Sequence, residues 1–204
     1  LKRKKKKYLK FNKDKKITKN KTDKICYYIK NDDNYGCGLG HNFGYQFCLL
    51  NKFKLIARID NDMIVPANTI FKLVKRLKEN QKIIAISPKI MFAQKPNFVW
   101  WRGSEIGHNL KLQRNCASYS PKGHPDQKEF RGLIETDALS GCASILRSDK
   151  LKKSGLSDPD FFYGEEDTEL SVRLKKLGGY LMADLDEKIY HHVSLTVGSN
   201  WSKN

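Results

Sequence analysis

Two aspartates separated by one residue, Asp60 and Asp62, are the sharpest candidate for chemistry in this chain. They directly follow a β-prone apolar run, 53–59, so both carboxylates are expected at the carboxyl end of a strand. In open α/β sheets that edge faces the crevice in which ligands bind. Paired carboxylates bind hard divalent cations, which in turn hold phosphate oxygens. The alternative is a strand-to-turn junction in which these side chains make only local hydrogen bonds.

Two further groups of ionisable residues lie nearer the end of the sequence. Glu165, Glu166 and Asp167 open a predicted helix, where a carboxylate at a pocket mouth can act as a general base. The helix dipole also favours acids in a first turn, so a purely structural role is equally open. His191 and His192 lie in a strand-like run, where one could supply a neutral imidazole to a metal ion or serve only the structure.

A glycine-rich segment, Asn34 to Gly44 (NYGCGLGHNFG), precedes the aspartates. We expect a loop here, because glycine serves where the backbone turns tightly or approaches a ligand. The spacing of Gly36, Gly38 and Gly40 departs from the dinucleotide fingerprint at the third glycine. A strand is also predicted sooner than the helix of that fingerprint would allow. The sequence therefore argues against a dinucleotide site.

The elements that must position these residues follow from the apolar pattern. Strand-like runs are expected at 25–29, 53–59, 83–86 and 188–193, with Pro88 closing the third. A helix opened by Pro66 has its apolar positions on one face; these are Ile70, Phe71, Val74 and Leu77. The order strand, loop, strand, helix, strand predicts a layered α/β sheet with parallel strands.

The second half of the chain is expected to begin with irregular structure. Trp100 to Gly103 and the polar stretch 107–132 predict a long loop region, and order returns with the apolar run 139–146. A second helix is expected over 166–177, ending at Gly178, where glycine supplies a left-handed exit.

Charge and composition exclude several classes of protein. The chain has 204 residues and a net charge of +17, of which +11 lies in residues 1–24. Hydrophobic residues make up 39%, which excludes a wholly disordered chain. Lysine greatly outnumbers arginine, which is a poor match for base-specific recognition of nucleic acid. The basic segment is therefore interpreted as a solvated lysine-rich stretch, with an anionic membrane surface as the other partner it could bind.

The cysteines and the hydropathy of the chain indicate in which cellular compartment it is expected. The five cysteines form no CxxC pair and are odd in number, so neither a zinc site nor a disulfide framework is expected. Free thiols fit a reducing cytoplasm. No apolar run approaches the roughly 20 residues that span a bilayer, and none reads as a signal peptide.

The order of these motifs along the chain resembles one known family. The spaced glycines come first, followed by the Asp-x-Asp element, the small-residue turn around Gly141, the stretch from Phe161 to Arg173, and finally His191. That series resembles the family-2 glycosyltransferases, and within them the rhamnosyltransferase-like enzymes of bacterial surface-polysaccharide and lipopolysaccharide assembly. The resemblance runs from about Asp33 to Gly198, and its most specific part is 161–173.

The resemblance implies a GT-A fold, that is, an α/β, Rossmann-like nucleotide-diphospho-sugar transferase with a mixed sheet flanked by helices. It implies an inverting, hexosyltransferase-type transfer from a nucleotide-diphospho-sugar to a hydroxyl of a saccharide or lipid-linked acceptor. Mg²⁺ or Mn²⁺ would be the cofactor, bound by Asp62 and His191, with Asp60 on the donor. Asp167 would be the catalytic base.

The resemblance also implies further substrate contacts. Gly141 and Cys142 would line the donor-sugar and acceptor site, together with Glu166 and Arg173 of the acidic motif. Trp101 is a candidate for stacking on a sugar face, with burial in the core as the alternative.

The resemblance also sets expectations for organisation and location. The family begins with a nucleotide-binding strand and a helix before the strand expected at 25–29. Residues 1–24 are therefore expected to be the remnant of that helix and its loop, and 25–204 the catalytic domain of an N-terminally truncated chain. A cytoplasmic protein is expected, with peripheral association at the inner face of the plasma membrane left open. Two alternatives are a basic nucleic-acid-binding module and an inactive truncated transferase that acts as a binding protein.

Overall fold

The computed structural model describes residues 18–19, 25–26, 28–106, 112–113 and 123–193. The chain divides into two compact units, Leu1–Asn34 and Tyr35–Asn204. In the first unit, strands β1 (Thr18–Lys19) and β2 (Ile25–Cys26) pair antiparallel. β2 begins where the sequence predicted a strand. Most of the lysine-rich segment 1–24 lies outside the described residues, and its interpretation as a remnant helix and loop stays a prediction.

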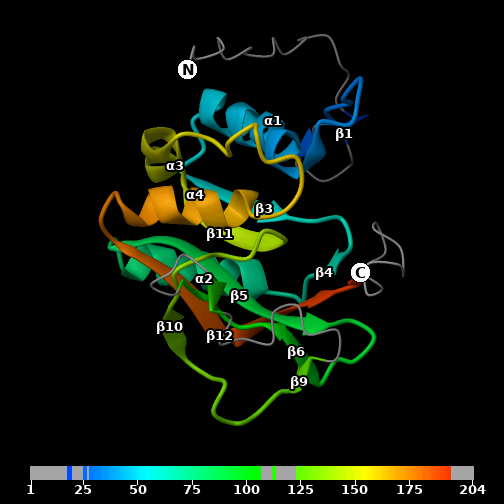
Figure 1. The fold of residues 1–204 in the computed structure, drawn as a ribbon, viewed down its shortest axis with the longest axis vertical. Coiled ribbons are helices and arrows are strands. Elements are labelled where there is room, and N and C mark those ends of the chain that lie inside the picture. The colour runs from blue at the N-terminus through cyan, green and yellow to red at the C-terminus, as the bar shows by residue number, and fades with distance from the viewer. Residues whose placement is uncertain (1–17, 20–24, 27, 107–111, 114–122, 194–204) are drawn as a thin grey trace. The chain divides into compact units, whose positions relative to one another are not determined.

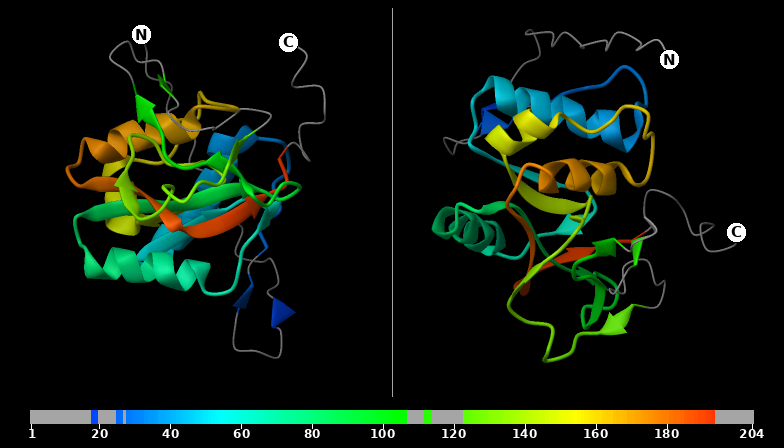
Figure 2. Two further views of the ribbon diagram at one scale, coloured as in Figure 1. Left: turned by 90° about the horizontal axis from the view of Figure 1, so that it is seen from below. Right: turned by 60° about the vertical axis from the view of Figure 1, so that its left-hand side comes forward.

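The second unit is a mixed β-sheet with helices on both faces (Figure 1). The helices are α1 (Gly36–Leu50), α2 (Thr69–Glu79), α3 (Ser148–Ser154) and α4 (Glu166–Lys175). The strands of the main sheet are β3 (Leu55–Ile59), β4 (Met63–Ile64), β5 (Ile83–Phe92), β6 (Phe98–Trp101), β9 (His124–Pro125), β10 (Leu133–Glu135), β11 (Ala143–Arg147) and β12 (Tyr180–His191). A separate pair is formed by β7 (Glu105–Ile106) and β8 (Leu112–Gln113). Helices α1, α3 and α4 cover one face and α2 covers the other (Figure 2).

The central strand order is β10-β12-β5-β11-β3. β5 and β12 are parallel, whereas β11 runs antiparallel to both β3 and β5, and β10 runs antiparallel to β12. The mixed α/β class implied by the resemblance is confirmed. The expectation of parallel strands throughout is wrong, because β11 enters between β3 and β5 from the opposite direction.

β5 runs through Pro88, which the sequence predicted would close it. β11 pairs with β5 only at Ala85 and Ile86, and β6 takes over at Ile90 and Met91. Pro88 therefore lies where neither neighbour on that side pairs with it. The pairing with β12 on the other side shifts register next to Pro88. A missing N–H is tolerated at such a place, so the strand continues to Phe92.

The glycine-rich segment is a helix and not the expected loop. α1 begins at Gly36 and continues for 15 residues. Its glycines lower the intrinsic helix propensity, but Tyr45 is buried in the core and Cys48 and Leu49 pack against it. Tertiary packing therefore overrides the local preference for a loop.

Three of the four residues assigned to the apolar face of α2, Ile70, Val74 and Leu77, pack in the core as expected, together with Leu73, which was not predicted; the fourth, Phe71, does not. Leu73 and Leu77 are fully buried, and Ile70 and Val74 pack partly against them. Phe71 is 69% exposed, so its place on the apolar face was wrong. A helix turns about 100° per residue, so Phe71 lies roughly 100° away from Ile70 and 200° from Leu73.

The remaining expectations for the second half of the chain hold in part. α4 begins at Glu166 as predicted, and its exit runs through Gly178 with a φ of 73°. The segment around Trp100, expected to be loop, contributes β6 to the sheet. Part of the expected loop, 107–111 and 114–122, lies outside the described residues. The short helix α3 had no prediction, and the final strand β12 starts eight residues earlier than expected.

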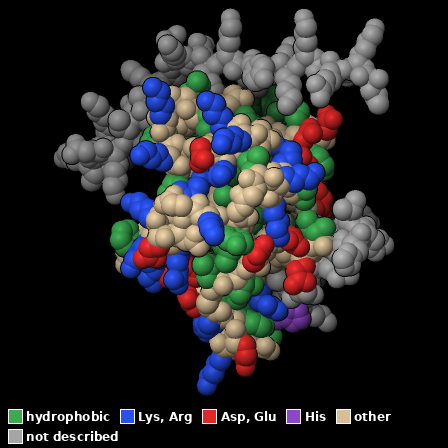
Figure 3. Space-filling view, turned by 90° about the vertical axis from the view of Figure 1, so that its left-hand side faces the viewer, with side chains coloured by type: hydrophobic (Ala, Val, Ile, Leu, Met, Phe, Trp, Pro, Cys, Tyr) green, Lys and Arg blue, Asp and Glu red, His purple; other side chains and the backbone are tan. Residues whose placement is uncertain are grey.

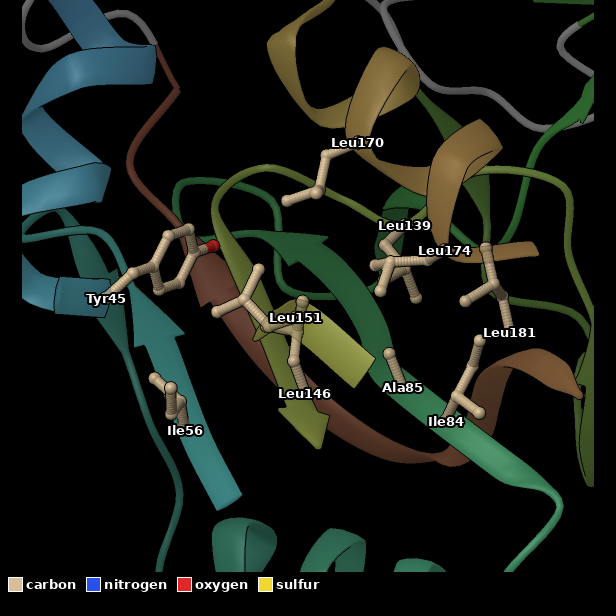
Figure 4. Packing of buried hydrophobic residues seen from close by; sticks show 10 residues of the cluster. All are labelled: Tyr45, Ile56, Ile84, Ala85, Leu139, Leu146, Leu151, Leu170, Leu174 and Leu181. Carbon is tan, nitrogen blue, oxygen red and sulfur yellow. The ribbon is translucent and has the colours of Figure 1, made fainter. Parts of the chain in front are cut away.

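The principal core lies between the sheet and the helices α1, α3 and α4 (Figure 4). Tyr45 from α1, Leu151 from α3 and Leu170 from α4 meet Leu146 of β11 there. Burial of such side chains contributes about 1.5–3 kcal/mol each before chain entropy is counted. The core therefore fixes the start of α4, and with it the acidic motif, against the sheet.

The face of the molecule drawn in Figure 3 carries Lys and Arg side chains interspersed with Asp and Glu. The coloured part of this face is therefore not a continuous basic surface of the kind that nucleic-acid-binding proteins present. Among the helices of the described residues, none is long and apolar enough to cross a membrane.

Candidate active site

The Asp-x-Asp element lies at the carboxyl end of β3, as the sequence predicted. The Asp60 N–H donates to the carbonyl of Cys142 at 2.9 Å, which continues the ladder between β3 and β11 by one more bond. The Asp60 side chain is 38% exposed, and its Oδ1 lies 3.7 Å from Nε2 of His41 in α1. Asp60 therefore presents a carboxylate at the edge of the sheet while its backbone is fixed.

Asp62 and His191 meet although 129 residues separate them. Oδ2 of Asp62 lies 3.3 Å from Nε2 of His191, and the two side chains are 14% and 12% exposed. β4 and β12 pair beside them, with Met63 opposite His191, so the sheet itself sets this distance. The indole of Trp100 contacts the imidazole edge-on, with ring centroids 4.8 Å apart. The structure thus brings together the two residues assigned to a metal.

These two residues fit a divalent cation. Adjacent ligands of an octahedral ion, each about 2.1 Å from it, lie about 3 Å apart. The separation of 3.3 Å between Asp62 Oδ2 and His191 Nε2 is close to that value. Within the described residues there is no cluster of three or more His, Cys, Asp or Glu side chains suited to a metal. Among the residues that the structure describes, Asp62 and His191 are thus the two ligands offered at this place.

Asp167 is the second residue of α4, half-buried and held on one side. Its Oδ1 accepts the N–H of Thr168 at 2.8 Å, and its backbone carbonyl accepts the Ser171 hydroxyl at 2.6 Å. Its other oxygen, Oδ2, faces Gly141: a Cβ at that glycine would lie only 2.7 Å from it. Gly141 and Asp167, both predicted site residues, are thus in direct contact, and the glycine leaves room for the carboxylate.

A buried arginine lies beneath the carboxylates. Arg58 of β3 is 8% exposed, and its Nη2 donates to the carbonyl of Ser140 at 2.9 Å. Burial lowers the pKa of Arg58, but the pKa is raised overall by acidic groups close by. These are Tyr45, Asp167, Asp60 and Glu166. Arg58 is therefore a buried positive charge close to the carboxyl groups of Asp60, after β3, and of Glu166 and Asp167 in α4.

Glu166 differs from its neighbour Asp167 in environment. Its side chain is 6% exposed, and burial, followed by the nearby charge of Asp167, raises its pKa. Asp167, by contrast, is only half-buried. Of the two carboxyl groups, Asp167 is therefore the better candidate for a base that meets substrate.

Three other residues that were predicted to contact substrate, Cys142, Trp101 and Arg173, form contacts within the protein. Cys142 is buried, its Sγ lies 3.0 Å from the Ser140 hydroxyl, and burial raises the pKa of its thiol. Trp101 is 2% exposed and donates to the Ser104 hydroxyl at 3.0 Å, which favours the core interpretation over sugar stacking because no ring face is open.

The third is Arg173, whose guanidinium donates to the carbonyls of Ser154, Gly155 and Leu156. It also forms an ion pair with Glu169, one turn earlier in α4. These bonds engage the guanidinium within the protein. Arg173 thus ties α4 to the segment after α3.

Two residues of this site were not predicted from the sequence. Arg58 and His41 carry no motif, although an arginine inside an apolar strand, two residues before Asp60, was an available signal. His41 lay in a segment interpreted as loop. A shallow hollow lined by Gln81, Lys82, Ile84, Lys150 and the Gly178–Tyr180 turn is also present, and none of the predicted site residues lines it.

A mixed sheet flanked by helices, with aspartates at the end of a central strand and an acidic helix start beside them, defines an α/β domain similar to the GT-A glycosyltransferase fold. The sequence pattern described as "Glycosyl transferase family 2" matches residues 12–154. The chain belongs to this family. No curated protein sequence matches it.

Among solved structures, the chain is similar to "Crystal structure of GalNAc-T7 with UDP, GalNAc and Mn2+". The TM-score is 0.58 with 16% identity, over 80% of this chain and 31% of that one. The chain thus spans less than a third of that relative's length, and the likeness shows the fold. It is also similar to "Crystal Structure of A197 from STIV", with a TM-score of 0.48 and 12% identity, over 76% of this chain and 66% of that one.

Proposed function

We propose that this chain transfers a sugar, with inversion, from a nucleotide-diphospho-sugar to an acceptor hydroxyl in polysaccharide or glycolipid assembly. The observation that carries the proposal is the place of Asp167. Its carboxylate is half-buried, held at one oxygen by Thr168, and left clear at the other by Gly141. Asp60 shares the counter-charge of Arg58 with it. A base and a phosphate-side carboxylate thus lie around one buried cation.

The reaction requires one proton acceptor. An acceptor hydroxyl is a poor nucleophile at neutral pH, so Asp167 takes its proton while the new bond to the anomeric carbon forms. The bond from that carbon to the phosphate oxygen breaks, and the electron pair leaves with the nucleoside diphosphate. The buried positive charge of Arg58 lies near this carboxylate.

The leaving diphosphate belongs to the side of the site that holds Asp60 and Asp62. Asp62 and His191 are the residues that would hold Mg²⁺ or Mn²⁺, with Asp60 on the donor. When bound, such an ion neutralises charge that develops on the departing diphosphate. The relative of similar fold was solved with UDP, GalNAc and Mn²⁺, which supports a nucleotide-sugar donor, a saccharide as substrate and a divalent metal here.

The identity of the base is tested with Asp167→Asn. This variant keeps the shape of the side chain and loses its basicity, so we expect transfer to fall by at least 100-fold, the lower end for general base catalysis. Donors for the assay are UDP-N-acetylgalactosamine, UDP-glucose, GDP-mannose and dTDP-rhamnose. Affinity for UDP with Mn²⁺, measured by calorimetry, should stay within twofold. Retained turnover in this variant would remove Asp167 from the mechanism.

Binding of nucleotide separates the alternatives. Metal-dependent affinity for UDP, GDP or dTDP is expected of a transferase. Affinity for nucleotide without turnover of any donor would favour a binding protein. Salt-sensitive binding of an unrelated DNA duplex, lost on deletion of residues 1–24, would favour a nucleic-acid-binding module.

A further inference from the structure

The loop that leads into α4 rests on α1, the glycine-rich helix. Asn42 of α1 is 6% exposed, and its side chain forms hydrogen bonds with both the carbonyl and the N–H of Ser157. Its Nδ2 donates to the Ser157 carbonyl at 2.8 Å, and its Oδ1 accepts the Ser157 N–H at 2.9 Å. These two bonds, to the peptide groups on either side of Ser157, fix the position and the orientation of the loop at this residue.

The start of α1 contacts the same loop further along. The Cys37 N–H donates to the Phe162 carbonyl at 2.7 Å, which satisfies one of the free donors at the start of a helix. A Cβ at Gly36 would lie 2.1 Å from that carbonyl oxygen, and a Cβ at Gly38 would lie 2.9 Å from the Phe161 carbonyl oxygen. The loop backbone therefore approaches α1 as closely as it does only because glycines stand at these positions.

Gly38 also lies close to Glu166, in the acidic motif itself. A Cβ at Gly38 would lie 3.6 Å from Cβ of Glu166, the first residue of α4. At the other end of the loop, Arg173 holds the carbonyls of residues 154–156 from within α4. The segment from Ser157 to Phe162 is thus fixed from α1, and Asp167 follows five residues later.

We propose that Gly38 and Asn42 are positioning residues, and that α1 is a template that sets the place of the 157–165 loop and through it the place of Asp167. In this role the glycines act by letting two backbones meet, and the Cys37 N–H donates to the Phe162 carbonyl at that contact. The effect on catalysis rests on the proposed function of Asp167, whereas the effect on the loop does not.

The helix provides its own matched control. Gly40 lies two residues after Gly38 in the same helix, and a Cβ there would meet nothing within 4 Å. Gly38→Ala and Gly40→Ala gain the same helix propensity, about 1 kcal/mol each, so they differ in the contact with the loop. Gly38 is preferred to Gly36 because Gly36 has a φ of 74°, where alanine would also strain the backbone.

The test combines hydrogen exchange with kinetics on the full chain. Gly38→Ala and Asn42→Ala should speed amide exchange in the peptide covering 155–166. With the best donor of the panel above, kcat should fall about tenfold, because sub-ångström displacement of a catalytic group has costs of this order. The KM for the donor should stay within twofold, since Asp60 and Asp62 follow β3 and lie outside the loop. Gly40→Ala should change neither exchange nor kcat.

Each other outcome has a defined meaning. Unchanged exchange in both Gly38→Ala and Asn42→Ala would overturn the template, and faster exchange with unchanged kcat would overturn the positioning role. An equal effect of Gly40→Ala would assign the changes to the helix and not to the loop contact. If the wild-type chain turns over no donor, the proposed function fails, while the exchange measurement still decides whether α1 holds the loop.

Discussion

Gly141→Ala is expected to disable the base without unfolding the protein. A methyl group at Gly141 would lie 2.7 Å from Oδ2 of Asp167, 3.2 Å from its Cγ and 3.4 Å from its Cβ. Gly141 does not have a left-handed φ, so alanine adds no backbone strain there. The perturbation is therefore confined to the carboxylate that is proposed to accept the proton.

The size of the effect follows from these distances. A comfortable contact between such atoms is about 3.5 Å, so Oδ2 must retreat by about 0.8 Å from the 2.7 Å position. The retreat is opposed because Oδ1 accepts the Thr168 N–H and the Asp167 carbonyl accepts the Ser171 hydroxyl. A misplacement of about 1 Å can cost about 100-fold in rate. We therefore expect kcat to fall by some tens of fold, or about 2 kcal/mol.

Initial rates with the best donor of the panel give kcat and KM, and calorimetry gives the affinity for UDP with Mn²⁺. KM and UDP affinity should stay within twofold, because the substitution leaves Asp60 and Asp62 in place. The double variant Gly141→Ala, Asp167→Asn should be no slower than Asp167→Asn alone, since both act through one carboxylate. Wild-type kcat in Gly141→Ala, or additive losses in the double variant, would refute this reasoning.

Three further outcomes are expected. Asp62→Asn should abolish the dependence of UDP binding on Mn²⁺ in calorimetry, and unchanged metal dependence would exclude Asp62 as a ligand. Burial would raise the pKa of Asp126, but hydrogen bonds from Lys188 and Lys89 lower it to about 2. Because this pKa is depressed in the folded state, Asp126 contributes stability above pH 4 that is lost as the pH falls towards 2, about 2 kcal/mol in all. In urea unfolding, Asp126→Asn should lower the free energy of unfolding by about 3 kcal/mol or more at pH 7, because it leaves the fully buried Lys89 without its partner. At pH 2 the loss should be smaller. An equal loss at both pH values would contradict a stabilising ion pair between Asp126 and Lys89. Leu73→Ala should cost about 2–5 kcal/mol in the same assay, whereas Phe71→Ala, at an exposed position, should cost under about 0.5 kcal/mol.

Short-range sequence patterns were enough to locate the strand and the helix that carry the predicted site residues. The apolar run before Asp60 and the acidic start of α4 were both located correctly, because a strand followed by turn-forming residues and a helix opened by acids are short-range patterns. The left-handed exit at Gly178 is of the same kind. The predicted roles of these residues remain predictions, although the structure places Asp62 beside His191 and Gly141 beside Asp167.

Other features were wrong in the sequence analysis because their cause is not local. The glycine run from Gly36 forms a helix, since Tyr45 and its neighbours are buried in the core and the loop ending at Phe162 caps the helix start. Pro88 lies inside a strand because two partner strands leave it unpaired on one side. Neither condition can be read from the residues that surround these positions.

The sequence by itself determined which residue types were available for chemistry and the order in which short strands, turns and helices present them, because those choices depend on neighbours a few positions away. The tertiary structure decided which of them meet. Strand pairing across 129 residues brought Asp62 to His191, close packing placed Gly141 against Asp167, and folding buried the positive charge of Arg58 near Asp60 and Asp167. Contact, burial and dielectric environment are properties of the folded chain, so these features became visible only there.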